Sequence, residues 1–266
     1  MACKICGGPT QVTHKGVILG KHEVAYHLCE VCEFCCTDEP FWLEEAYSQA
    51  IAATDTGLVQ RNLAVARSLR MLLPRLFPTG PYVDWAGGYG MLVRLLRDDG
   101  LECYWQDRYA PNLLARGFEW EANRAGRNAS VATAIEALEH APDPLSFLSG
   151  CLAGTGARAV LFTQVLHSGR PDPDWWYLAP AAGQHVSFFS AKTLAEVAER
   201  LGMHLSSFGE LHLLSCDPVS AAGSRWALRG GRLASRASAR FWSGRRRASL
   251  TWADHLRLTE QLTADG

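Results

Sequence analysis

The chain has 266 residues, of which 48% are hydrophobic, and its formal net charge at pH 7 is -1. This length suffices for one sizeable α/β domain with a small additional lobe. The near-zero charge argues against a nucleic-acid partner, and no apolar run is long enough for a membrane span. Because the N-terminus also lacks the layout of a signal peptide, we expect a cytoplasmic protein.

The cysteine spacing near the N-terminus predicts a metal site. Cys3 and Cys6 form one C-x-x-C pair, and Cys29 and Cys32 form a second. Each such turn aims two thiolates at one point, and four sulfur ligands leave no open coordination position. We therefore expect a structural zinc ion that holds a small lobe over residues 1–40. A redox pair or chance spacing is the alternative. Residues that could replace a predicted ligand are Cys35, Cys36, His14, His22 and His27.

Residues 41–78 are expected to form a helical connector, with helices over 42–53 and 57–73. From residue 79 the pattern changes to short apolar strands that alternate with helices, which is typical of a parallel sheet covered on both faces. The strands are expected at 82–86, 102–106, 130–135 and 158–164, and the helices at 91–99, 112–116 and 144–152.

The second half of the chain begins with a non-periodic segment from Leu166 to Phe188 that is rich in Trp, Pro and Gly. Segments of this length without regular structure are usually functional. The pattern then predicts a helix over 190–202, with Ser190 as its N-cap, and a strand hairpin over 204–216. The α/β domain is therefore expected to span residues 79–217, followed by a basic helical extension over 218–266.

A glycine-rich turn follows the first strand of the expected sheet. A P-loop requires Gly-Lys-Ser/Thr, which the turn lacks, and a dinucleotide fingerprint requires a third glycine where Val93 stands. What remains is an acidic residue, a small residue and two glycines: Asp84, Ala86, Gly88 and Gly90. Asp107 ends the second strand, where an open α/β sheet places the carboxylate that binds a ribose. Together these features predict a cofactor that contains a nucleoside.

This turn resembles motif I of class I S-adenosylmethionine-dependent methyltransferases. In that family the backbone of the turn approaches the amino-acid end of the cofactor, and the acidic residue helps to orient it. Ala86 stands where glycine is commoner, and Gly87 beside it keeps the turn flexible. Much of residues 1–205, including EALEHAPDP and WWYLAPAAGQHVSFFSAKTL, looks like a bacterial group of such enzymes with N-terminal C-x-x-C pairs. Its layout is similar to that of sugar C-methyltransferases. The resemblance implies a Rossmann-like α/β sheet of seven strands whose last hairpin is antiparallel.

The resemblance also indicates candidate catalytic residues. Methyl transfer often requires a base near the methyl group. His185 in GQHVSFF matches the late catalytic histidine of the sugar C-methyltransferases, although Gly183 and Gln184 replace the His-Glu that precedes it there. Tyr47, from the connector that would cover the acceptor site, and Glu136, after the fourth strand, are the other candidates. A loop-holding role for His185 and a packing role for Tyr47 are the structural alternatives.

We thus expect S-adenosylmethionine-dependent methyl transfer to a small-molecule acceptor that bears a sugar, such as a nucleotide-sugar or glycan. Trp175, Trp176 and Tyr177 would suit stacking on a sugar ring or closing a lid, unless the core buries them. The arginines at 245–247 would grip a phosphate or form a solvated helix face. The alternatives are a methyltransferase for a non-sugar secondary metabolite and a non-catalytic protein whose zinc lobe recruits a partner. A homodimer is compatible with each of these.

Overall fold

The computed structural model describes residues 1–48, 55–219 and 247–264. The chain forms two compact units. Unit 1 comprises residues 1–56, 134–154 and 159–218, and unit 2 comprises residues 57–133, 155–158 and 219–266. Each unit therefore combines segments that are far apart in the sequence.

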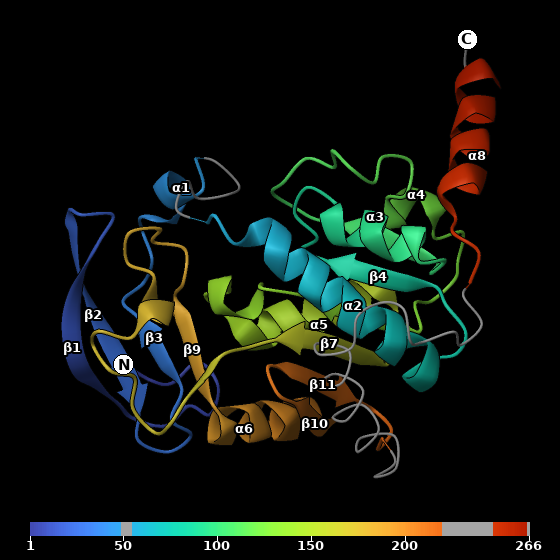
Figure 1. The fold of residues 1–266 in the computed structure, drawn as a ribbon. Coiled ribbons are helices and arrows are strands. Elements are labelled where there is room, and N and C mark those ends of the chain that lie inside the picture. Colours follow the sequence, from blue (N-terminus) through green and yellow to red (C-terminus); the bar gives the residue numbers. More distant parts are fainter. Residues whose placement is uncertain (49–54, 220–246, 265–266) are drawn as a thin grey trace. The chain divides into compact units, whose positions relative to one another are not determined.

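Unit 1 contains a five-stranded sheet, a strand hairpin and several helices (Figure 1). Its elements are β1 (Thr10–Ile18), β2 (His22–Cys29), β3 (Cys35–Thr37), α1 (Leu43–Ala46), the 3-10 helix η1 (Leu138–His140), α5 (Pro144–Thr155, whose last residue falls in unit 2), β7 (Ala159–Thr163), β8 (Leu166–His167), the 3-10 helix η2 (Trp176–Leu178), β9 (Ser187–Ser190), α6 (Ala191–Leu201), β10 (His204–Phe208) and β11 (Leu211–Ser215).

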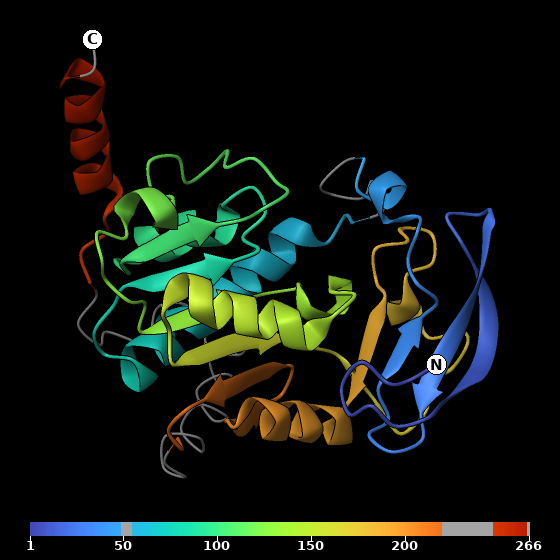
Figure 2. The same ribbon diagram turned by 180° about the vertical axis from the view of Figure 1, so that it is seen from behind.

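The five-stranded sheet has the order β1-β2-β3-β9-β8. The pairing of β3 with β9 joins segments about 150 residues apart. The two strands run antiparallel, with Cys35 opposite Phe188 and Cys36 opposite Ser187. Figures 1 and 2 both show these strands side by side. Tyr26, Trp42 and Phe188 are at most 2% exposed and belong to one apolar core. The N-terminal strands are thus built into the sheet that contains the strand after His185.

The expected hairpin near residue 210 is confirmed. β11 pairs antiparallel with β10 on one side and with β7 on the other. Helix α6, which precedes the hairpin, begins as predicted at Ser190. The Ser190 side chain accepts a hydrogen bond from the backbone N–H of Thr193, and the Thr193 hydroxyl accepts one from the N–H of Ser190. This reciprocal capping satisfies two donors that a helix start leaves unpaired.

Unit 2 contains the glycine turn and the helices around it. Its elements are α2 (Leu58–Leu76), β4 (Tyr82–Trp85), α3 (Met91–Asp98), β5 (Cys103–Gln106), α4 (Trp120–Asn123), β6 (Val131–Ala134, whose last residue falls in unit 1) and α8 (Thr251–Ala264). β4 pairs in parallel with β5 and with β6, which places Asp84 opposite both Trp105 and Thr133. This arrangement confirms the predicted α/β alternation for the first strands of the expected domain.

Two sequence expectations for this part of the chain are wrong. The described residues contain six strands of the expected sheet, three mainly in each unit, instead of seven. Beyond β5 there is only an isolated parallel bridge between Trp105 and Glu119, preceded by Gly117 with a left-handed φ of 83°. The helix predicted over 112–116 is absent as well. There the Asn112 side chain accepts a hydrogen bond from the Ala115 N–H and donates one to the Ala115 carbonyl, which favours a turn.

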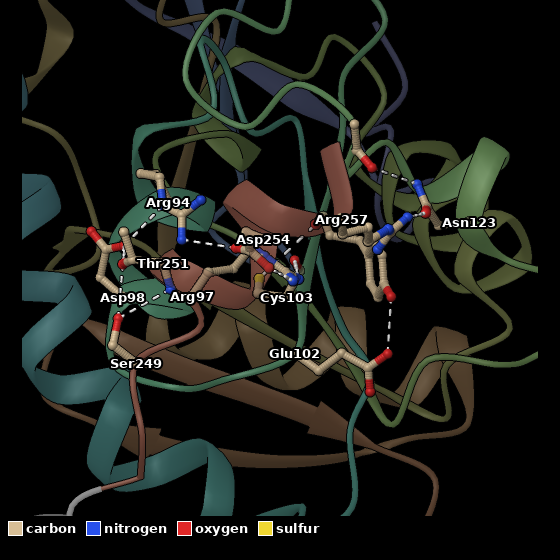
Figure 3. Close-up of polar contacts among 12 residues, drawn as sticks. Arg94, Arg97, Asp98, Glu102, Cys103, Asn123, Ser249, Thr251, Asp254 and Arg257 are labelled. Atoms are coloured by element: carbon tan, nitrogen blue, oxygen red, sulfur yellow. Dashed lines mark hydrogen bonds and ion pairs between the residues drawn. The ribbon is translucent and has the colours of Figure 1, made fainter. Parts of the chain in front are cut away.

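Helix α8 packs onto α3 through a buried ion pair (Figure 3). Arg97 of α3 and Asp254 of α8 are 4% and 5% exposed, and Arg97 donates to both carboxylate oxygens at 2.6 and 2.8 Å. The guanidinium also donates to the Cys103 carbonyl at 3.0 Å and lies 3.7 Å from the centre of the Phe118 ring. Arg94 also donates to Asp254 at 2.9 Å. Removing Asp254 would leave Arg97 buried without its carboxylate partner, so α8 is anchored to the helix that follows the glycine turn.

The predicted C-terminal extension lies partly outside the described residues. Helix α8 agrees with the predicted helical character, whereas residues 220–246, which include Arg245 and Arg246, lie outside the described residues. The same holds for residues 49–54 of the first predicted connector helix, of which α1 is the described part. Among the helices within 1–48, 55–219 and 247–264, none is long and apolar enough to cross a membrane.

Candidate active site

The glycine turn in unit 2 has a strained, left-handed backbone. Ala86, Gly88 and Gly90 have φ values of 61°, 53° and 86°. A Cβ atom on Gly90 would lie 2.8 Å from the Asn112 Oδ1 atom, so this position requires glycine for space as well as conformation. Ala86 occupies a conformation that residues other than glycine rarely adopt. The structure thus gives a physical reason for the glycine that related motifs carry at this position.

Asp107 holds the glycine turn from the end of β5. Its Oδ2 atom accepts a hydrogen bond from the Gly88 N–H at 2.9 Å, and its Oδ1 atom accepts from the N–H groups of Tyr109 and Ala110 at 2.7 and 2.8 Å. The Trp105 indole donates to the Gly88 carbonyl at 2.7 Å. Asp107 directly follows β5, in agreement with its predicted place at the end of the second strand. Its carboxylate is therefore positioned by backbone groups.

Asp84 lies two residues before Ala86, the first left-handed residue of the turn, and is 3% exposed. Burial raises the pKa of its carboxyl group to about 7, although a hydrogen bond from the Thr133 hydroxyl at 2.7 Å favours the charged form. The nearby charge of Asp107 raises this pKa further. Thr133 was not predicted as a site residue, since a threonine in a buried strand carries no distinctive signal. An Asp84 of this pKa changes its charge in the neutral range.

Unit 1 brings several polar side chains together in what we call the histidine cluster, defined by Tyr47, Glu139, His140, Tyr177 and His185. The Tyr47 hydroxyl lies 2.8 Å from the His140 Nδ1 atom. The His140 and His185 rings meet edge to face, with centroids 4.8 Å apart. The structure therefore links two predicted residues, Tyr47 and His185, through His140.

The His185 ring is oriented by a backbone group. Its Nδ1 atom lies 2.7 Å from the Tyr177 carbonyl oxygen. A carbonyl oxygen only accepts, so Nδ1 carries the proton, and in the neutral ring Nε2 is the basic nitrogen. Burial and the negative charges of Glu139 and Glu136 raise the pKa of the Tyr177 phenol. The phenol therefore stays protonated and does not compete with His185 as the base.

Glu136 lies in the same segment of unit 1 but makes a different contact. It adopts a left-handed φ of 50°, its N–H donates to the Thr163 hydroxyl at 2.7 Å, and that hydroxyl donates to its Oε1 atom at 2.8 Å. The structure does not place it in the group formed by Glu139, His140 and His185. Thr163 at the end of β7 thus holds both the backbone and the side chain of Glu136.

The three adjacent aromatic residues have different environments. Tyr177 is 2% exposed and contacts the His185 ring, whereas Trp176 is 73% exposed. Trp175 packs against Tyr177 and against Phe188 of the core. Only Trp176 therefore offers most of its ring to solvent, and the other two largely serve packing.

The four predicted zinc ligands lie together in unit 1. Cys3, Cys6, Cys29 and Cys32 offer sulfur atoms within 4.8 Å of one another. The Cys3–Cys32 and Cys6–Cys29 sulfur distances are 3.6 and 3.4 Å. Around a tetrahedral zinc ion with Zn–S bonds of about 2.3 Å, sulfur atoms lie about 3.8 Å apart. The donor set and its spacing therefore fit a four-sulfur zinc site.

Backbone groups support this arrangement of sulfurs. N–H groups of Ile5, Gly8 and Val31 donate to the sulfurs of Cys3, Cys6 and Cys29, each at 3.4 Å. The hydrogen bond between Cys3 and Cys32 lowers the pKa of the Cys3 thiol to about 5 and raises the pKa of the Cys32 thiol, so Cys3 is the member of this pair that is favoured as the thiolate that metals bind. The alternatives considered from sequence lie elsewhere: Cys35 and Cys36 are in β3, His14 stacks on Tyr26, His22 contacts Glu45 and His27 contacts Asp38.

Residues 58–207 match the family described as "Methyltransferase domain". The match covers more than half of the chain and includes the glycine turn, Asp107, Glu136, His140 and His185. A search of curated proteins found no match.

Several solved structures match about two thirds of this chain, with TM-scores below 0.5. The mitomycin 7-O-methyltransferase MmcR is 16% identical with a TM-score of 0.45, and the match covers 65% of this chain and 59% of that one. The O-methyltransferase NcsB1 from neocarzinostatin biosynthesis, in complex with S-adenosyl-L-homocysteine and 1,4-dihydroxy-2-naphthoic acid, is 17% identical with a TM-score of 0.44, and the match covers 66% and 60%. Magnesium protoporphyrin IX methyltransferase ChlM from Synechocystis PCC 6803 is 12% identical with a TM-score of 0.40, covering 66% and 94%.

The chain thus spans about three fifths of the length of MmcR and NcsB1. With identities of 12–17% and TM-scores below 0.5, these matches carry no conclusion about this chain. The family match over residues 58–207 is the stronger finding, and by it the chain belongs to the methyltransferase domain family.

Proposed function

We propose that this protein transfers a methyl group from S-adenosylmethionine to a sugar-bearing small molecule, with His185 as the base. The observation that carries the proposal is that one family match, over residues 58–207, includes both the glycine turn and two histidines of the cluster. In this proposal the glycine turn would bind the methyl donor, and His185 would take up the proton of the acceptor.

The residues of the turn fit the donor in their chemistry. S-adenosylmethionine supplies a methyl group on a positively charged sulfur when it is bound. The backbone at Ala86, Gly87, Gly88 and Gly90 would hold its amino-acid end, because a turn without bulky side chains lets a ligand approach the main chain. Asp84 would orient the ammonium group of that end, and Asp107 would accept hydrogen bonds from the ribose hydroxyls.

The acceptor needs a base with a lone pair, and His185 meets this requirement. The hydrogen bond from Nδ1 to the Tyr177 carbonyl fixes the ring orientation and leaves Nε2 as the proton-accepting nitrogen. Tyr47 would act through its contact with His140, either on the acceptor or by holding that ring. Glu136, held by Thr163, would contact an acceptor hydroxyl.

Two observations support a sugar-bearing acceptor. They are the resemblance of the GQHVSFF segment to sugar C-methyltransferases and the exposed Trp176 ring next to Tyr177 of the cluster. An exposed indole face suits stacking on the apolar face of a sugar ring. A planar aromatic metabolite would stack equally well, so an acceptor of that class is the second candidate.

The four cysteines would bind one structural zinc ion. Their spacing and the N–H groups directed at the sulfurs support this, and four ligands would leave no position for a substrate. Through β3 and β9 this site would steady the segment that carries His185. The Thr193 hydroxyl also donates to the Cys32 carbonyl at 2.9 Å, which ties the cysteine loop to α6.

The test is a transfer assay with full-length protein, S-adenosylmethionine and two acceptor panels, nucleotide-sugars and hydroxylated aromatic compounds. Formation of S-adenosylhomocysteine together with a methylated nucleotide-sugar is the expected result. Trp176→Ala should raise the KM for that acceptor, while Trp252→Ala, on the exposed side of α8, serves as the matched control. Turnover of aromatic compounds alone would replace the sugar assignment, and failure to bind S-adenosylmethionine at all would refute the activity.

A further inference from the structure

Unit 1 holds a second group of metal-binding side chains that shares no residue with the four cysteines. Glu139, His140 and His185 each offer a ligand atom, and these atoms all lie within 4.8 Å of one another. Glu139 is 0% exposed, whereas both histidines are partly exposed. We propose that these three residues bind a divalent cation of the zinc class through two imidazole nitrogens and one carboxylate oxygen.

The outer contacts of the two histidines are those of metal ligands. Histidines that bind metals usually make a hydrogen bond with their second ring nitrogen, which fixes the ring. Here Nδ1 of His185 donates to the Tyr177 carbonyl at 2.7 Å, and Nδ1 of His140 lies 2.8 Å from the Tyr47 hydroxyl. The His185 contact leaves Nε2 as the basic nitrogen of that ring, and the Tyr47 contact engages Nδ1 of His140, so a cation would bind both rings through Nε2.

Main-chain contacts set the spacing between the two ligand-bearing segments. The Val186 N–H donates to the Glu139 carbonyl at 2.9 Å, and the Ser187 hydroxyl donates to the Ala141 carbonyl at 2.7 Å. Each contact joins residues next to the ligands, so the backbone positions are fixed before any cation arrives. Nitrogen and oxygen ligand atoms around a tetrahedral zinc ion lie about 3.4 Å apart. Small rotations of the three side chains would bring their ligand atoms to this spacing.

The donor set selects the class of cation. Imidazole and carboxylate together suit zinc and other late divalent metals, whereas calcium and magnesium prefer oxygen ligands alone. Three protein ligands leave at least one position open, in contrast to the closed site that four cysteines would form. The buried Glu139 carboxylate gains from a neighbouring positive charge, because burying a negative charge is costly.

A bound cation would occupy the lone pair that His185 needs as a base. Zinc beyond the first equivalent should therefore inhibit methyl transfer, and this consequence rests on the proposed function. Cation binding itself does not rest on it, so the two can be tested separately.

The experiment titrates full-length protein with Co²⁺ alone and then with Zn²⁺ as a competitor. Cobalt bound to cysteines has strong thiolate charge-transfer absorption, and cobalt bound to nitrogen and oxygen has only weak visible bands. We expect one equivalent of the first kind and a second equivalent of the other kind. Glu139→Gln and His185→Ala should each weaken the second equivalent at least about 10-fold, the smallest loss usual for a change even outside the ligands.

Glu136→Gln is the matched control, because Glu136 lies three residues from Glu139 but outside the group. It should retain both equivalents. Wild-type protein that binds only the thiolate equivalent overturns the proposal, and so does a second equivalent that is equally tight in His185→Ala, a change at a partly exposed residue. A second equivalent in a protein without methyl transfer would refute the proposed function alone.

Discussion

The glycine turn of unit 2 and the histidine cluster of unit 1 are held in place in different ways. In the turn, left-handed backbone and N–H groups that donate to Asp107 fix the geometry within a stretch of about 25 residues. In the cluster, side chains from three distant segments meet, as the Tyr47–His140 pair illustrates. A substitution at the partly exposed histidines of the cluster should therefore change chemistry with little effect on folding. One in the turn should change affinity or stability through the backbone.

The largest effect is expected from removing the zinc ion proposed for the four cysteines, because its loss would act on stability and not on a single contact. Structural zinc contributes roughly 10 kcal/mol or more to small zinc-dependent folds. Cys29→Ser should abolish tight zinc binding and expose the amides of β1 to β3 to hydrogen exchange. Elemental analysis and exchange measurements check this. Cys35→Ser, in β3 but outside the four-sulfur group, should keep its zinc, and the reverse outcome would reassign the ligands.

His185→Asn tests whether the cluster acts by chemistry. The change keeps polarity and approximate size but removes the proton acceptor, so the rate should fall by about 10²–10⁴-fold while cofactor affinity stays the same. Single-turnover transfer, with the enzyme saturated in both substrates, is the measurement. His204→Asn, at an exposed histidine of β10, is the control. A near wild-type rate would move the search for the base to Glu136 and Tyr47.

The pH dependence of stability tests Asp84 in the turn. Its pKa of about 7 in the folded protein exceeds the ordinary value of 3.8, so between these values the folded state binds more protons than the unfolded state. The free energy of unfolding should therefore fall as the pH rises from about 4 through 7, by a few kcal/mol. Thermal unfolding at pH 5 and pH 8 compares wild type with Asp84→Asn. An equal pH dependence in both proteins would contradict the shift.

Asp107→Ala should weaken S-adenosylmethionine binding, since the proposal gives its carboxylate the ribose hydroxyls. The loss of one or two hydrogen bonds to a charged group corresponds to about 1.5–3 kcal/mol each. Calorimetry measures it, with Asp174→Ala in the exposed loop of unit 1 as the control. Unchanged affinity in a folded Asp107→Ala protein would refute the ribose-binding role.

The smallest effect concerns Ala86, whose left-handed φ of 61° is strained. Ala86→Gly should stabilise the protein by up to about 1 kcal/mol, because relief of 1–2 kcal/mol of strain exceeds the entropy cost of glycine. Gly90→Ala in the same turn should instead destabilise it, since the new Cβ would lie 2.8 Å from Asn112 Oδ1. Denaturant unfolding of both variants gives the two signs, and equal signs would contradict the strain argument.

The parts of the molecule that the sequence predicts well are local in the chain. The strand, turn and helix around Asp84 and Gly90, the capped start of α6 and the hairpin of β10 and β11 follow from spacing, turn residues and capping residues within short windows. The helix predicted over 112–116 failed although its apolar spacing suited a helix, because the Asn112 side chain bonds to its own turn. The predicted seventh strand is missing from the described residues, because beyond β5 only Glu119 pairs there.

The sequence indicated candidate residues one by one but not how they are arranged. His185 and Tyr47 were predicted singly, each beside a structural alternative. Nothing in the sequence indicated that His140 contacts both, since the pairs are 93 and 45 residues apart. Likewise, the pairing of β3 with β9 has no local signature, because it depends on two short buried strands meeting across the fold.

That pairing has a consequence for how the protein is made. All four clustered cysteines lie within the first 32 residues, so they can gather around an ion as soon as they leave the ribosome. Strand β3 must wait until Ser190 has been synthesised before it finds β9. During that interval the edge of β3 lacks its partner strand β9, and Tyr26 of β2 lacks its packing partner Phe188, a state that favours aggregation. Early metal capture would protect the nascent N-terminus, and slow synthesis in metal-depleted cells would lower the yield of folded enzyme.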